Sequence, residues 1–96
     1  MKKIEPRQLK VKKVFEKPVL STELKNKHNK EIYEGDIVCF DFDSNYRTFI
    51  FWENGAFNFK GENQSTLQLT PDFAQHMITI GSLFENPELL NGGKNG

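Results

Sequence analysis

Apolar and polar residues alternate along much of this chain with the period of two that is typical of β-strands. The clearest example is residues 37–42, IVCFDF, where Val38, Phe40 and Phe42 fall on one face and two aspartates fall on the other. This alternation predicts a strand that turns its phenylalanines toward a core and its carboxylates toward solvent. A second strand, rich in aromatic residues, is predicted over residues 46–53.

Turn-forming residues separate these strands. Asn54-Gly55 stands between two aromatic runs and predicts a type I′ hairpin, because both central residues of that turn need positive φ. Asp43-Ser44-Asn45 predicts the hairpin before it. Polar residues 21–30 are typical of a turn, with Asn29 suited to a left-handed conformation. Pro18 is expected to end the strand that precedes them.

The remaining patterns complete a mainly β chain. Strands are predicted over residues 9–15, 56–60, 67–69 and 77–80, and short helices over residues 71–76 and 86–90. Five or six short strands, with one or two helical turns near the C-terminus, predict a small SH3-like barrel. We expect residues 1–20 to form a basic segment, as a strand or an arm, residues 21–90 the barrel, and residues 91–96 a disordered tail. The expected core residues are Val38, Phe40, Ile50 or Phe51, Phe57, Phe59, Leu69, Ile78 and Ile80.

The second aromatic strand is apolar on both faces. Phe49 and Phe51 point one way while Ile50 and Trp52 point the other, and one small core cannot easily cover both sides. Aromatic side chains anchor many protein interfaces, so we expect the second face to meet a partner, with Trp52 as its main anchor. Tyr46, at the start of the same strand, is a further candidate for this contact.

Charge is divided along the chain, although the formal net charge is zero. Residues 1–30 carry ten lysines and arginines against three acids, whereas residues 31–96 carry three against ten. We expect the basic third, with Lys10, Lys12 and Lys13, to lie on acidic surface of the same copy or of a neighbouring copy. Binding of nucleic acid through this segment is the alternative, because basic segments contact phosphates. The zero net charge and the acidic strand residues favour the first interpretation.

Candidate catalytic and metal-ligating residues are few. Cys39 is the only cysteine, which excludes an internal disulfide, and its apolar neighbours predict a buried, inert thiol. His28 and His76 are the only histidines, and neither shares a short ligand spacing with Cys39. The carboxylates of residues 31–36 are interpreted as part of a turn that enters a strand. The sequence contains no Walker loop, nucleophile elbow or zinc-protease motif, so we expect no enzyme, no metal and no cofactor.

The length of any apolar stretch bears on location. No stretch approaches the roughly 20 consecutive apolar residues of a membrane helix. The first residues, MKKIEPRQLKVKK, contain no apolar run suited to a signal peptide. We therefore expect a soluble protein of the cytoplasm.

Two segments carry a family resemblance. Residues 24–38, LKNKHNKEIYEGDIV, and residues 80–90, IGSLFENPELL, resemble the opening and closing motifs of the YopX family of bacteriophage and prophage proteins. Their order and their separation by an aromatic middle also match, and together they bracket residues 22–90. Asn29 and Ser82 stand where family members usually carry Gly and Asn. The resemblance implies an SH3-like barrel and a phage or prophage origin, and it implies no activity.

The function that these features favour is a non-enzymatic accessory protein that binds protein, including itself, in the cytoplasm of a bacterial host. Binding of nucleic acid through the basic N-terminal segment is the alternative, and inhibition of a host defence protein is a further one. The candidate partner-binding residues are Trp52, Ile50, Tyr46, Lys10, Lys12 and Lys13.

Overall fold

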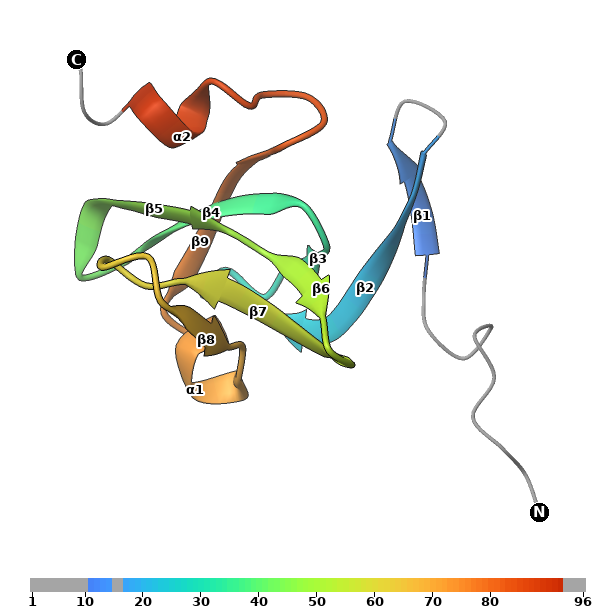
Figure 1. The fold of residues 1–96 in the computed structure, drawn as a ribbon, viewed down its shortest axis with the longest axis horizontal. Coiled ribbons are helices and arrows are strands. Elements are labelled where there is room, and N and C mark those ends of the chain that lie inside the picture. Colours follow the sequence, from blue (N-terminus) through green and yellow to red (C-terminus); the bar gives the residue numbers. More distant parts are fainter. Residues whose placement is uncertain (1–10, 15–16, 93–96) are drawn as a thin grey trace.

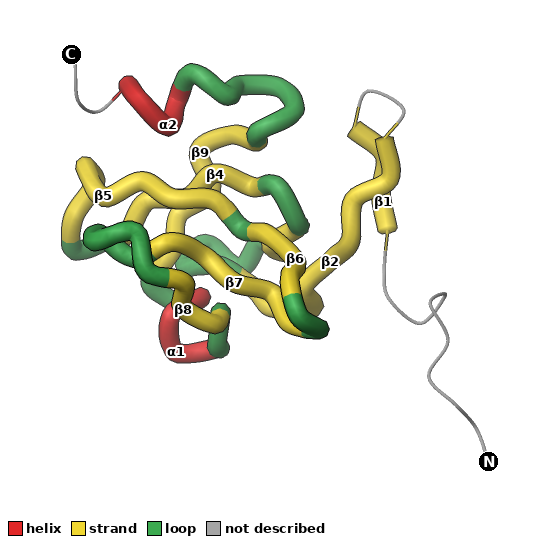
Figure 2. Tube along the Cα trace, viewed as in Figure 1, coloured by secondary structure: helices red, strands yellow, loops and turns green. Residues whose placement is uncertain are grey.

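The computed structural model describes residues 11–14 and 17–92. In chain order their elements are β1 (Val11–Val14), β2 (Lys17–Lys25), β3 (Glu31–Tyr33), β4 (Asp36–Phe40), β5 (Asp43–Phe49), β6 (Phe51–Glu53), β7 (Ala56–Lys60), β8 (Thr66–Gln68), α1 (Pro71–Ala74), β9 (Met77–Ser82) and α2 (Leu89–Gly92). The strands form three antiparallel sheets with the orders β1-β2-β3, β5-β4-β9 and β6-β7-β8 (Figures 1 and 2). The mainly β prediction is confirmed. The described strands do not close into a barrel, so the predicted SH3-like barrel is not confirmed.

Strand β1 and the first half of β2 form an arm that extends beside the body of the molecule (Figure 1). The strand predicted over residues 9–15 is present as β1, and its predicted ends lie outside the described residues. Pro18 does not end a strand, because it lies within β2 opposite Lys13. Strand β3 pairs with β2 only from Ser21 onward, so one edge of β2 is open at Pro18 and a proline is tolerated there.

Strand β2 continues into residues for which the sequence predicts a turn. The turn predicted over residues 21–30 is therefore wrong in its first half. The polar side chains of this part of β2 form buried hydrogen bonds, which composition alone does not reveal. The hydroxyl of Thr22 donates to the carbonyl oxygen of Ile32 at 2.7 Å, and Ser21 is fully buried. The turn follows β2, and Asn29 has the predicted positive φ, 65°.

The turn between β4 and β5 comes earlier than predicted. Phe40 pairs with Asp43, so that Asp41 and Phe42 form the turn and residues 43–45 already belong to β5. Phe42, expected on the same inward face as Phe40, is instead 67% exposed. Strand β4 is the central strand of its sheet and is buried along its whole length.

The aromatic strand predicted over residues 46–53 is divided at Ile50, because β5 and β6 belong to different sheets. The Ile50 N–H donates to the carbonyl oxygen of Asp36 at 3.0 Å, and the Gly35 N–H donates to the carbonyl oxygen of Ile50 at 2.7 Å. The chain passes from one sheet to the next at this point, so the residues on either side do not keep a common face. Ile50 is fully buried while Trp52 is 41% exposed, and the prediction that they share one face is wrong.

The predicted Asn54-Gly55 turn and the two predicted helices can be compared with the structure one by one. Asn54 and Gly55 have φ of 55° and 77°, which confirms the predicted turn with positive φ at both positions. Helix α1 begins after Thr70, whose hydroxyl accepts a hydrogen bond from the Phe73 N–H, and it ends two residues earlier than predicted. Helix α2 begins at Leu89, three residues later than predicted, and includes residues 91–92, which the sequence assigns to the tail. No helix in the described part of the chain is long and apolar enough to span a membrane.

One hydrophobic cluster joins the sheets. It consists of Ile32, Val38, Phe40, Ile50, Phe59, Leu69, Ala74 and Met77. Of the predicted core residues, Val38, Phe40, Ile50, Phe59 and Leu69 are buried, whereas Phe51, Phe57, Ile78 and Ile80 are only partly buried. Strand β9 is therefore held at its start by Met77, and residues 78–81 lie closer to the surface.

Candidate functional site

Two pairs of partly exposed aromatic side chains lie on β5, β6 and β7. The ring of Trp52 meets the ring of Phe57 edge-on, with centroids 4.6 Å apart, and these residues are directly opposite on β6 and β7. The rings of Phe49 and Phe51 are 5.5 Å apart. The Lys60 ammonium lies 5.3 Å from the centroid of the Phe51 ring. We call Trp52 and Phe57 the Trp52 surface, because Trp52 is the more exposed of the pair and is the predicted anchor.

The other two candidates on the second aromatic strand are used inside the molecule. Ile50 is fully buried and cannot contact a partner, so its prediction as a binding residue is wrong. The physical reason is the crossing between sheets, which directs Ile50 into the core. Tyr46 is partly buried, and its ring stacks on that of Phe40 with centroids 4.6 Å apart.

The predicted basic residues lie on the arm or before it. Lys10 falls outside the described residues, whereas Lys12 and Lys13 are exposed on β1. The Lys12 ammonium lies over the ring of Tyr33, 4.2 Å from its centroid. A lysine of the arm therefore contacts the acidic body of its own copy, through an aromatic face.

A groove of about 620 Å³ opens between the arm, the β2–β3 turn, the end of β9 and the segment that follows β9. We call it the acidic groove, because four carboxylates line it: Glu31, Glu34, Asp36 and Glu85. Its basic lining residues are Lys12, His28 and Lys30, and its aromatic ones are Tyr33 and Phe84. Concave sites with aromatic walls and a few converging polar groups are the usual places for ligands. The excess of carboxylates suits a cationic ligand group.

Asp36 is the most buried carboxylate of the groove, with 7% of its surface exposed. Its Oδ2 accepts a hydrogen bond from the Tyr33 N–H at 2.8 Å, and no described residue donates to its Oδ1. Burial raises the pKa of Asp36 to about 6, because desolvation disfavours the charged form. The hydrogen bond from Tyr33 and the charge of Lys12 act to lower that pKa, and the charge of Glu85 acts to raise it.

Two further carboxylates are fixed at the edge of the groove by β2. Oε1 of Glu34 accepts from the Leu20 N–H at 3.2 Å, and the Glu34 N–H donates to the Leu20 carbonyl oxygen at 2.8 Å. The Ser21 hydroxyl donates to the carboxylate of Glu31. Among the described residues, no group of three or more histidine, cysteine or carboxylate side chains is placed to hold a metal ion.

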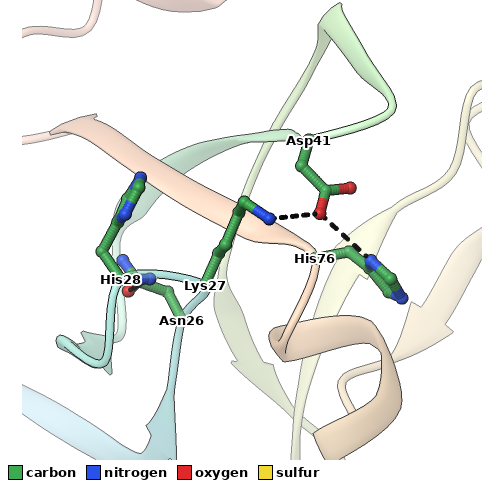
Figure 3. Close-up of polar contacts among 5 residues, drawn as sticks. All are labelled: Asn26, Lys27, His28, Asp41 and His76. Atoms are coloured by element: carbon green, nitrogen blue, oxygen red, sulfur yellow. Dashed lines mark hydrogen bonds and ion pairs between the residues drawn. The ribbon is translucent and has the colours of Figure 1, made fainter.

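A second polar cluster connects three turns of the body. Oδ2 of Asp41 lies 3.2 Å from Nζ of Lys27 and 3.3 Å from Nδ1 of His76. Figure 3 shows Lys27 and His76 both pointing toward Asp41, whereas His28 points away from it. Partial desolvation acts to raise the pKa of Asp41, but the hydrogen bonds and charges of His76 and Lys27 outweigh it and hold that pKa below its usual range. One carboxylate oxygen shared by a lysine ammonium and an imidazole nitrogen is the geometry of a polar link between turns.

The same β2–β3 turn thus serves both clusters. Asn26 organises it: Oδ1 of Asn26 accepts from the N–H groups of His28 and Lys30, and Nδ2 donates to the hydroxyl of Thr79 at 3.0 Å. Lys27 then reaches Asp41 on one side, while His28 and Lys30 line the acidic groove on the other.

Cys39 lies in the buried strand β4, as the sequence predicts. Burial raises the pKa of its thiol, and the nearby charge of Arg47 opposes that rise. A buried thiol with a raised pKa is a poor nucleophile, because the thiolate is the reactive form.

The acidic groove is the site that sequence reasoning misses. The three carboxylates of residues 31–36 are interpreted as a turn, and the predicted backbone hydrogen bond to Asp36 is indeed present. A signal was available, because these carboxylates and Glu85 lie in the two segments that resemble one family. Among the described residues that line the groove, only Lys12, Val19 and Thr79 fall outside residues 24–38 and 80–90.

Together the fold and the groove define a small, mainly β protein of three antiparallel sheets with an acidic cleft beside its N-terminal arm. A model of the family described as YopX protein matches residues 3–91. The chain therefore belongs to the YopX family. The match begins at residue 3, so it also includes most of the basic N-terminal segment, which the two motifs leave out. A comparison with curated proteins found no match.

Proposed function

We propose that this protein is a protein-binding module and that two copies associate through the Trp52 surface. The observation that supports this proposal is the exposure of Trp52, 41% of whose surface is open to solvent although it lies in the middle of a strand. Its ring is held by Phe57 at 4.6 Å, so little side-chain freedom is lost when a partner covers it. Tryptophan held in this way is typical of the anchor residues of interfaces.

The partner that fits best is a second copy of the chain. Residues 1–30 and residues 31–96 carry opposite net charges of equal size, so each copy offers both signs to the other. Complementary charge orients an encounter and excludes wrong partners, while apolar area supplies most of the affinity. We therefore assign the attachment to Trp52 and the orientation to the basic arm.

The proposed setting follows from the family. The chain acts as a non-enzymatic accessory protein of a phage or prophage, in the cytoplasm of the bacterial host. Its self-association then presents several copies of each binding surface to a host or phage protein. The avidity of such an assembly exceeds the affinity of one copy without any new contact.

Mass measurement across a range of concentrations tests the association. Light scattering coupled to size exclusion should give more than the monomer mass at micromolar concentration. Trp52→Ala should weaken association about thirtyfold, the equivalent of a 2 kcal/mol anchor. The matched control is Phe42→Ala, which removes a more exposed aromatic ring from the β4–β5 turn, at the other end of the body from the β6–β7 turn (Figure 1).

Three outcomes would overturn the proposal. A monomer mass at every concentration would remove self-association. Equal weakening by Trp52→Ala and Phe42→Ala would show that loss of exposed apolar area in general, and not the Trp52 surface, is responsible. Loss of association in high salt with no effect of Trp52→Ala would assign the contact to the basic arm instead.

A further inference from the structure

The acidic groove contains a carboxylate, that of Asp36, with an oxygen that accepts no hydrogen bond from the described residues. Asp36 is more than nine-tenths buried and lines the groove, yet its Oδ1 receives no hydrogen bond from any described residue. A carboxylate oxygen that lines a groove and receives no hydrogen bond from the described residues can accept one from a ligand. Glu34 and Glu85 line the same groove and add negative charge around it.

The arm shows which chemical group this groove accepts. The ammonium of Lys12 lies 4.2 Å from the centroid of the Tyr33 ring, at the side of the groove that the arm forms. Its charge acts on the Asp36 carboxyl from there, without a hydrogen bond between the two side chains. An ammonium over an aromatic face beside carboxylates is a common arrangement for recognition of a cationic side chain. The groove that Lys12 lines has a volume of about 620 Å³ and also contains the aromatic ring of Phe84 and the carboxylates of Glu34 and Glu85.

We propose that the acidic groove binds a lysine side chain presented by an extended segment of a partner protein, and that Lys12 is a built-in competitor at its mouth. The incoming ammonium donates to Oδ1 of Asp36 and lies between the carboxylates of Glu34 and Glu85. Its segment runs beside β1, because Lys12 shows that a lysine carried on a strand reaches the Tyr33 ring. Binding therefore displaces or shifts the Lys12 ammonium. The apparent affinity for the incoming lysine is for this reason lower in the natural protein than in a variant without Lys12.

This proposal is independent of the Trp52 surface. The groove is lined by residues of the arm, the β2–β3 turn, β3, the start of β4, β9 and the segment after it, whereas Trp52 and Phe57 belong to β6 and β7. A protein that fails to self-associate could still bind lysine in the groove. Conversely, Trp52→Ala should leave binding in the groove unchanged.

The test is a titration of the full-length, ¹⁵N-labelled protein, followed by NMR. The probe is the acetylated and amidated peptide LKVKK, which has the sequence of residues 9–13, and its neutral counterpart is LQVQQ. The lysine peptide should shift the amide signals of Tyr33, Asp36 and Ser82 in a saturable way, and the glutamine peptide should not.

Three variants separate the groove from general charge attraction. Lys12→Ala should raise the affinity for LKVKK about two- to fivefold, the equivalent of one exposed cation–π contact. Lys13→Ala removes the same charge from the neighbouring position of β1 and should leave the affinity nearly unchanged. Asp36→Asn should lower the affinity about tenfold or more, because a charge-assisted hydrogen bond becomes a neutral one.

The gain of affinity in Lys12→Ala is a second measurement of the site that leaves Asp36 unchanged. Equal responses of Lys12→Ala and Lys13→Ala would overturn the competitor role, because only one of the two lysines lines the groove. Shifts spread over acidic residues outside the groove, or no saturable shift in either the natural protein or Lys12→Ala, would overturn the site. Saturable shifts confined to the groove together with loss of self-association on adding the peptide would support the site and identify a second copy as the source of the lysine.

Discussion

Removal of the charge of Asp36 is expected to change how the stability of this protein depends on pH. The carboxyl is 7% exposed, and burial raises its pKa from the usual 3.8 to about 6. The attraction of Lys12 and the hydrogen bond from Tyr33 only partly offset that effect, and Glu85 reinforces it. The charged form of Asp36 is therefore less stable in the folded protein than in the unfolded chain.

The sign and size of the effect follow from proton linkage. Because the pKa of the folded state is the higher one, the folded state binds the proton more tightly between about pH 4 and pH 6. The free energy of unfolding therefore falls as the pH rises through this window. A shift from 3.8 to about 6, at about 1.4 kcal/mol per pKa unit, corresponds to about 3 kcal/mol. This contribution is fully present below about pH 4 and lost above about pH 6.

The informative variant is Asp36→Asn. Its side chain keeps an oxygen that can accept from the Tyr33 N–H, but it cannot ionise. The variant should be more stable than the natural protein at pH 7, by up to about 3 kcal/mol, and this advantage should vanish toward pH 4. Asp41 does not affect stability between pH 4 and pH 6, because its pKa is lowered. Its contribution to the free energy of unfolding is lost only as the pH falls below the usual 3.8.

The assay is urea unfolding between pH 4 and pH 7.5, followed by the fluorescence of Trp52, the only tryptophan. Glu53→Gln is the control, because it removes one exposed carboxylate from β6 and so accounts for the change in net charge. The reasoning fails if the difference between Asp36→Asn and the natural protein varies by less than about 0.5 kcal/mol over this range, the scale of an ordinary surface substitution. A carboxyl pKa near 3.8 for Asp36 in a ¹³C NMR titration would refute it directly.

Two further predictions concern the fold, and both are checked by chemical unfolding. Phe40→Ala should lower the free energy of unfolding by about 3–5 kcal/mol, because Phe40 is fully buried in the core cluster; a loss below about 1 kcal/mol would contradict that packing. Gly55→Val should cost about 1–2 kcal/mol, because its φ is 77° and a Cβ there meets nothing within 4 Å, so the cost is one of backbone conformation alone. Gly55→Asn is its control and should recover most of the loss, since asparagine tolerates positive φ; equal losses in both variants would contradict the conformational explanation.

The local elements of this protein are determined largely by its sequence. Asn54-Gly55 gives the two-residue turn because few other residues adopt positive φ twice in succession. Thr70 and Pro71 start α1 because the threonine hydroxyl accepts an orphan N–H and proline needs none. Alternation places Val38 and Phe40 in the core. In each case the sequence signal lies within a few residues of the chain.

The sequence predictions are wrong where the chain passes from one strand partner to another. Ile50 and Trp52 share a face only if the strand is straight, and the passage from one sheet to the next at Ile50 breaks that relation. Phe42 is exposed because Phe40 pairs directly with Asp43, a register that alternation does not specify. The predicted barrel is not confirmed, and alternation could not decide it, since closure depends on which strands pair.

The acidic groove is decided by tertiary structure alone. It forms because β4 pairs with β9, opposing Asp36 to Ser82, and because the arm returns Lys12 to Tyr33. Sequence motifs place the carboxylates in family segments, but they do not bring those segments together. The raised pKa of Asp36 is caused by burial, and the strand paired with Asp36 comes from a distant part of the sequence. Periodicity determines which face of a strand is apolar, whereas only the long-range pairing of strands determines what that face meets.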